Sequence, residues 1–77
     1  MERLFELGRL SDFYGGLLTE RQRNTVRRYA MDDYSLSEIA ELDGVSRQAV
    51  RDTLAHAEQQ MRAYEASLHL IERAERM

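Results

Sequence analysis

The sequence predicts an all-α protein, and three observations lead to this prediction. Proline is absent from the 77 residues and glycine occurs only four times, while good helix formers such as Ala, Leu, Glu, Arg and Gln dominate. Hydrophobic residues make up 43% of the chain and charged residues 32%, a balance typical of a chain that folds. Apolar residues recur at helical spacing. We therefore expect one small helical domain over residues 1–77 with a single modest core.

Several absences narrow the classes of function. The chain has no Cys, which excludes a disulfide framework, a thiolate metal site and a Cys nucleophile, and which fits the cytoplasm. No apolar run approaches the roughly 20 residues of a membrane span, so we expect no membrane partner. His56 and His69 would lie on opposite sides of one helix, and no phosphate loop or nucleophile motif is present. We expect neither an enzyme nor a cofactor or metal.

The first expected helix covers residues 2–14. It should end at Gly15 and Gly16, where a left-handed cap carries no steric cost. The segment Thr19-Glu20-Arg21-Gln22 matches a capping box and predicts the start of a second helix, which should end near Asp32 and Asp33 because acidic charge opposes the helix dipole there. The apolar positions of the first helix are Leu4, Leu7, Leu10, Phe13 and Tyr14, and those of the second are Val26, Tyr29 and Ala30.

A helix-turn-helix is predicted for residues 36–57. Its central stretch, "SLSEIAELDGVSRQAVRD" at residues 35–52, opens with a second capping box, formed by Ser35 and Glu38. Helical periodicity stops at Asp43 and Gly44, a glycine that tolerates positive φ, and Ser46 is placed to cap a new helix. A short helix, a turn containing glycine and a second helix are typical of this DNA-binding motif.

Arg47, Gln48 and Arg51 should point outward from the first turns of this second helix, the end that enters the major groove in a helix-turn-helix. Arginine can pair with guanine O6 and N7, and glutamine with adenine N6 and N7. The phosphate contacts that we expect are Ser35, Ser46, Arg27 and Arg28. Although the net charge is −3, residues 21–31 carry four arginines and no acid. Double-stranded DNA is therefore the expected partner, with a plain solvated arginine face as the alternative reading.

A third apolar stripe continues into a C-terminal helix, expected at residues 58–75. Its members alternate by four and three, and no opposite charges flank it for a parallel coiled-coil partner. We expect it to pack on the N-terminal helix, within the chain or from a second copy in a homodimer, with a break near Ser67. The stripe consists of Val50, Leu54, Ala57, Met61, Tyr64, Leu68 and Ile71.

Two segments resemble the YlxM family of small helix-turn-helix proteins: "LSDFYGGLLTERQR" and "DDYSLSEIAELDGVSRQAVRDTLAHAE". The resemblance runs from Leu10 to Ile71 and implies a fold similar to region 4 of sigma-70 factors. Members are usually encoded in bacteria beside the signal recognition particle GTPase. The resemblance implies a DNA-binding transcriptional regulator of those genes.

Two departures from the family pattern bear on DNA binding. Asp43 stands before the turn where members commonly have an apolar residue, and residues 53–56, Thr-Leu-Ala-His, replace a basic run. Because fewer phosphate contacts lower affinity, we expect weaker DNA binding than the motif alone implies. The chain also looks shorter at its C-terminus than typical relatives. The rival function is a protein-interaction module that docks on RNA polymerase or a signal recognition particle component through Glu58, Glu65 and Glu72.

Overall fold

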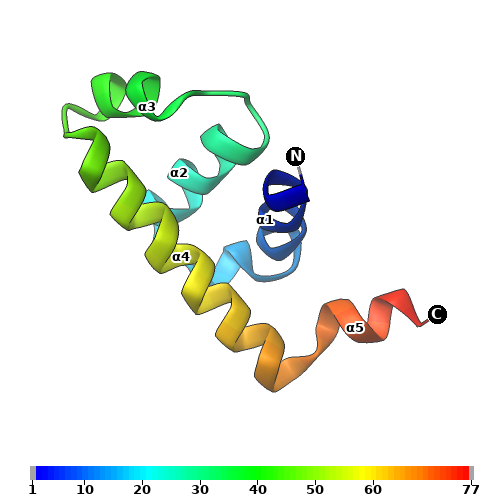
Figure 1. Ribbon diagram of the computed structural model, residues 1–77. Coiled ribbons are helices and arrows are strands. Elements are labelled where there is room, and N and C mark those ends of the chain that lie inside the picture. The colour runs from blue at the N-terminus through cyan, green and yellow to red at the C-terminus, as the bar shows by residue number, and fades with distance from the viewer. Residues whose placement is uncertain (1, 77) are drawn as a thin grey trace.

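The computed structural model describes residues 2–76, and the secondary structure that it contains there is entirely helical, as predicted. Figure 1 shows the long helix α4 crossing the molecule, with α3 at one end and α5 at the other. The elements in chain order are α1 (Glu2–Tyr14), the 3-10 turn η1 (Gly15–Leu17), α2 (Glu20–Ala30), α3 (Leu36–Asp43), α4 (Arg47–Leu68) and α5 (Leu70–Glu75).

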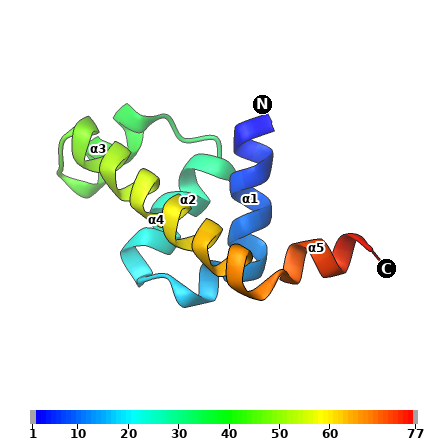
Figure 2. The ribbon, with the colours of Figure 1, turned by 60° about the horizontal axis from the view of Figure 1, so that its bottom comes forward.

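One core lies between α4 and the three helices before it. The predicted stripe of α4 supplies four of the buried side chains, and α1 packs against α4 within the chain, which confirms the intramolecular form of that prediction (Figure 2). Leu68 is 45% exposed, because the helix ends there and does not carry the stripe onward. The buried apolar residues are Leu7, Leu10, Tyr14, Leu18, Val26, Ile39, Ala40, Val50, Leu54, Ala57 and Met61.

The connection between α1 and α2 differs from the prediction. Neither Gly15 nor Gly16 adopts positive φ, and the chain instead forms a 3-10 turn in which the Leu18 N–H donates to the Gly15 carbonyl at 3.1 Å. Gly15 is buried, and a Cβ atom there would lie 3.0 Å from the Ser11 hydroxyl oxygen. Glycine at this position leaves room for the Ser11 hydroxyl of α1, and the prediction of a left-handed cap was wrong.

Both predicted capping boxes are present. The Thr19 hydroxyl accepts from the Gln22 N–H at 3.1 Å while the Gln22 side chain accepts from the Thr19 N–H, and Ser35 and Glu38 repeat the arrangement at the start of α3. Each box satisfies two backbone N–H groups that a helix start leaves without a partner. These local bonds explain why the sequence predicted the two helix starts correctly.

The turn between α3 and α4 is closed by Gly44, which adopts φ 66° and ψ 36°. Its N–H donates to the Glu41 carbonyl, and the next N–H, that of Val45, donates to the Ala40 carbonyl at 3.0 Å. Asp43, the departure from the family pattern, ends α3 and pairs with Arg28 of α2 at 2.9 Å. The acidic residue therefore leaves the geometry of the turn intact and ties it to α2.

Substitution Gly44→Ala is expected to lower the free energy of unfolding by about 1–2 kcal/mol, because an L-residue is strained in the left-handed region. No atom within 4 Å would meet the new methyl group, so strain alone is responsible. Gly16→Ala is the matched control, since that position is equally open and lacks positive φ. Urea unfolding followed by circular dichroism measures both, and equal losses would contradict the strain argument.

The predicted boundary between a helix-turn-helix at residues 36–57 and a C-terminal helix at residues 58–75 does not exist. Helix α4 runs without interruption for 22 residues, and its buried residues extend from Val50 in the part next to the turn to Met61 beyond the predicted boundary. The break predicted near Ser67 occurs at His69, which adopts φ 55° between α4 and α5. The buried apolar residues of α4 continue past residue 57 at the same helical spacing. This spacing gives the helix no reason to end at the predicted boundary.

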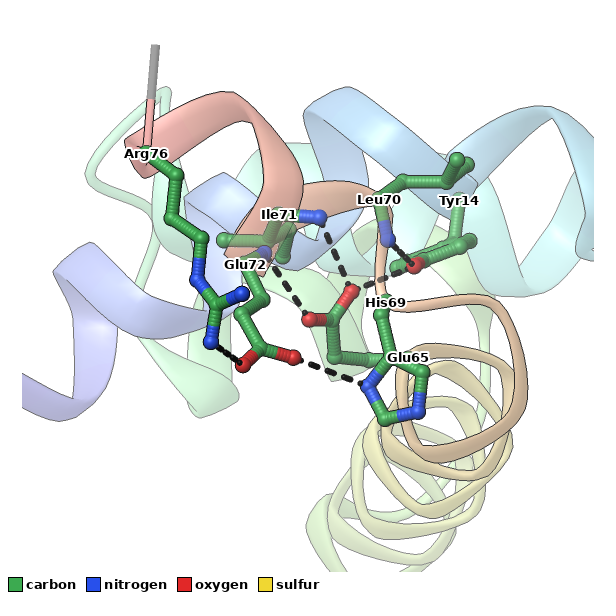
Figure 3. Close-up of polar contacts among 7 residues, drawn as sticks. All are labelled: Tyr14, Glu65, His69, Leu70, Ile71, Glu72 and Arg76. Atoms are coloured by element: carbon green, nitrogen blue, oxygen red, sulfur yellow. Dashed lines mark hydrogen bonds and ion pairs between the residues drawn. The ribbon is translucent and has the colours of Figure 1, made fainter.

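A polar network holds α5 at the end of α4 (Figure 3). The Glu65 carboxylate accepts from the N–H groups of Ile71 and Glu72 at 3.0 and 3.1 Å and from the hydroxyl of Tyr14. That hydroxyl in turn accepts from the Leu70 N–H at 3.2 Å. The side chains of Glu65 and Tyr14 thus accept hydrogen bonds from three N–H groups at the start of α5. The N-cap residue of α5, His69, makes no such side-chain bond.

Stability is expected to fall in acid partly through this network. Hydrogen bonds from Tyr14 and from the start of α5 lower the pKa of Glu65 in the folded chain. Its contribution is therefore complete above the unfolded pKa of about 4.3 and disappears as pH falls through the lower folded pKa. Thermal melts between about pH 3 and pH 6 should show a smaller pH dependence for Glu65→Gln than for the wild type. Parallel curves would contradict this assignment.

Candidate nucleic-acid interface

The helix-turn-helix comprises α3, the turn at Gly44 and the N-terminal half of α4. Helix α3 packs against α4. Ile39 and Ala40 of α3 are 0% and 6% exposed, and Val50 and Leu54 are the buried residues of α4 in this part of the core. The small Ala40 side chain allows the two helices to approach closely. The N-terminal end of α4 therefore stands at the end of the molecule away from α5 (Figure 1).

Arg47, Gln48 and Arg51 are all exposed on this end of α4. Ser46 caps the helix, its hydroxyl accepting from the Ala49 N–H at 3.0 Å, so the first turn that carries Arg47 and Gln48 is well ordered by its own hydrogen bonds. Among the side chains that the structure describes, those of residues 4–76, neither Arg47 nor Arg51 has an ion-pair partner. Two unneutralised guanidinium groups therefore face solvent at the end of the motif that contacts bases in helix-turn-helix proteins.

Ser35 and Glu38 occupy the start of α3. The Ser35 hydroxyl accepts from the Glu38 N–H at 3.1 Å, and the Glu38 carboxylate accepts from the Ser35 N–H at 2.9 Å. Hydrogen bonding by Ser35 lowers the pKa of Glu38, with the larger effect from the Ser35 backbone N–H and the smaller one from its hydroxyl. The Glu38 carboxylate is therefore ionised. The Glu38 carboxylate thus already places a negative charge where a phosphate contact was predicted. A phosphate that accepts from Ser35 would lie next to this charge.

The predicted arginines of α2 differ in their surroundings. Arg28 is paired with Asp43 at the turn, whereas Arg27 is exposed and has no ion-pair partner among the described residues. Arg21, which the sequence did not assign to the site, lines two shallow grooves of about 580 and 300 Å³. The smaller groove reaches Asp52 and His56 of α4, so Arg21 adds a positive charge beside this helix. Only the packing of α2 on α4 reveals that proximity.

The segment that replaces a basic run, residues 53–56, has mixed surroundings. Thr53 donates its hydroxyl to the Ala49 carbonyl at 3.0 Å and Leu54 is buried, while Ala55 and His56 are exposed. The side of α4 that follows Arg51 therefore presents no arginine until Arg62.

No group of three or more metal-ligating side chains exists in the described part of the chain, and no helix there is both long and apolar enough to cross a membrane.

Comparison with known proteins identifies the family. A sequence model of the UPF0122 family, described as "Putative helix-turn-helix protein, YlxM / p13 like", matches residues 1–77. The chain belongs to the UPF0122 family. The resemblance to YlxM proteins over residues 10–71 is thereby confirmed and extends over the whole chain.

Relatives from several bacteria match most of this UPF0122 chain. It is 49% identical over 71 residues to a UPF0122 protein of Desulforamulus reducens, and 47% identical over 70 residues to one of Streptococcus agalactiae. These alignments cover 92% and 91% of this chain but 61% and 64% of the relatives. A UPF0122 protein of Symbiobacterium thermophilum is 45% identical over 71 residues, 92% of this chain and 66% of its own. The chain spans less than two thirds of these relatives' length.

Proposed function

We propose that this UPF0122 chain is a DNA-binding transcriptional regulator that inserts the N-terminal end of α4 into the major groove of double-stranded DNA. The observation that carries the proposal is the exposed, unpaired state of Arg47 and Arg51 directly behind the Ser46 cap. An arginine fork matches the two acceptors of a guanine edge, and an ordered helix end lowers the entropy lost on binding.

The other predicted contact residues differ in whether they can reach DNA without a rearrangement. Gln48 lies beside the two arginines and contacts a base, while Ser46 and Arg27 contact phosphates. Arg28 and Ser35 contact phosphate only after rearranging the pair with Asp43 and the capping box with Glu38. With acidic groups so near and few phosphate contacts, non-specific affinity is low, and binding weakens with salt in proportion to the phosphates that the arginines neutralise.

We further propose that the target lies in the protein's own operon, among genes of the signal recognition particle pathway, and that the chain binds it as a homodimer. A pair of α4 ends related by a two-fold axis suits a pseudo-palindromic site. A groove of about 730 Å³ between α1, α4 and α5 supports self-association, since Phe5, 66% exposed, lines it together with Leu10 and Ile71.

The same groove supports the rival function, in which the chain docks on RNA polymerase or a signal recognition particle component. The acidic residues predicted for that contact all have intramolecular partners: Glu58 pairs with Arg62, Glu65 binds Tyr14, and Glu72 pairs with Arg76. A protein partner would therefore contact the apolar groove beside Phe5 rather than an array of free carboxylates.

Fluorescence-anisotropy titration of labelled duplexes from the protein's operon, at three salt concentrations, tests the proposal. We expect sequence-dependent binding that weakens as salt rises, and a molar mass of two chains by light scattering. Absence of binding to every duplex at the lowest salt would reject the DNA-binding function and favour the docking function. A one-chain mass would reject the dimer alone.

A further inference from the structure

Gln48 and Asp52 form a pair on the outer side of α4. The Gln48 Nε2 group donates to the Asp52 Oδ1 atom at 2.9 Å, and both residues are exposed. Each lies two residues from the buried Val50 and hence about 160° around the helix from it. The pair therefore occupies the side of the helix that faces away from the core, whereas Arg51 lies about 100° from Val50.

This hydrogen bond removes an ambiguity of the glutamine side chain. A free glutamine amide can turn over and present either its oxygen or its nitrogen to a base. A carboxylate only accepts hydrogen bonds, so Asp52 engages one of the two Nε2 protons and keeps Oε1 as an acceptor that has no donor among the described side chains. No ion pair within the described residues neutralises Asp52, and its charge remains beside Gln48.

We propose that Asp52 is a positioning residue for base recognition: it turns the Gln48 oxygen toward the groove, so that the pair selects adenine or cytosine over guanine or thymine on the contacted strand. This inference rests on the proposed DNA binding. Adenine and cytosine present an exocyclic amino donor in the major groove, whereas guanine and thymine present carbonyl acceptors at the corresponding place. An acceptor facing an acceptor leaves both without a partner, and the Asp52 charge adds repulsion.

The neighbouring side chains make the selectivity local. Arg47 and Arg51 are pure donors and favour guanine, which is the opposite preference to that of the pair. Asp52 lies one turn after Gln48, at the distance where helical side chains meet, so no movement of the backbone is needed to form the bond. The recognition surface thus combines two donors with one oriented acceptor.

Selection from a library of randomised duplexes, followed by sequencing, tests the proposal with the wild type and three variants. Gln48→Ala identifies the position concerned, because the base preference there should disappear. At that position we expect the wild type to prefer adenine or cytosine about tenfold, the size typical of one good base contact. Asp52→Ala should lose this preference while leaving the other positions unchanged. Asp52→Asn should keep only part of it, because an asparagine amide can offer Gln48 either its oxygen or its nitrogen and so holds the glutamine less firmly in one orientation.

The outcomes separate the inference from the proposed function. If Asp52→Ala raises affinity for all duplexes alike and keeps the base preference, Asp52 acts only through its charge and the inference is overturned while DNA binding stands. Equal loss of preference in Asp52→Ala and Asp52→Asn also overturns it. If the wild type enriches no duplex, the DNA-binding function itself fails and the inference falls with it. Unchanged thermal melting of all variants serves as the folding control.

Discussion

Replacement of Ile39 by alanine is expected to lower the free energy of unfolding by about 2–5 kcal/mol, the range for removing a large buried aliphatic side chain. Ile39 is 0% exposed and belongs to the core cluster. Helix α3 has only eight residues, too few for an isolated helix to be stable in water, so it depends on packing against α4. The cost is a large part of the roughly 5–15 kcal/mol that stabilises a typical domain.

Leu42→Ala is the matched control for Ile39→Ala. Leu42 lies in the same helix and is 57% exposed, so its truncation should change stability by no more than about 0.5 kcal/mol. Urea unfolding of both variants measures the difference. If the two substitutions cost the same, α3 is not held by the packing described, and the helix-turn-helix geometry at the start of α4 would need revision.

Simultaneous substitution of Arg47 and Arg51 by alanine is expected to weaken binding to a specific duplex by about 2 kcal/mol or more, because each arginine–guanine contact contributes about 1–3 kcal/mol. Both side chains are exposed and neither contributes to the core, so the melting temperature should hardly change. If either arginine contacts phosphate instead, the slope of log affinity against log salt falls by about one for each lost contact.

The control for this pair is Arg73→Ala combined with Arg76→Ala. It changes the net charge by the same amount on α5 and the C-cap residue that follows it, at the opposite end of α4 (Figure 1). Anisotropy titrations of both double variants should show a large loss only for the α4 pair. A similar loss from both would mean that net charge, and not a recognition surface, governs binding. An unchanged affinity of the α4 variant would exclude this end of α4 as the interface.

The candidate site was largely predictable because it depends on helical periodicity. The outward positions of Arg47, Gln48 and Arg51 follow from the apolar spacing of the residues between and after them. The bond from Gln48 to Asp52 joins residues one turn apart and could have been found in the sequence, but the prediction considered each side chain alone. The ion pair of Arg28 with Asp43 could not have been predicted from the sequence, because the spacing of residues along the chain does not say which positions on two different helices come together.

Features that depend on neighbours within about one turn of helix follow from the order of the amino acids alone. The two capping boxes, the Ser46 cap and the left-handed Gly44 all depend on hydrogen bonds or steric limits between residues at most four apart. For the same reason the helix type and most helix starts were correct. These elements have the same local energy whatever surrounds them.

Features that depend on groups far apart in the chain are fixed by the packing of the helices. Gly15 begins a buried 3-10 turn in place of the predicted left-handed cap, and α4 remains one helix because its buried stripe continues against α1 and α2. Helix α5 is held by Tyr14, 51 residues before its partner Glu65. A buried hydroxyl and a carboxylate need hydrogen-bond partners, and which groups come within reach is settled only when the helices pack together.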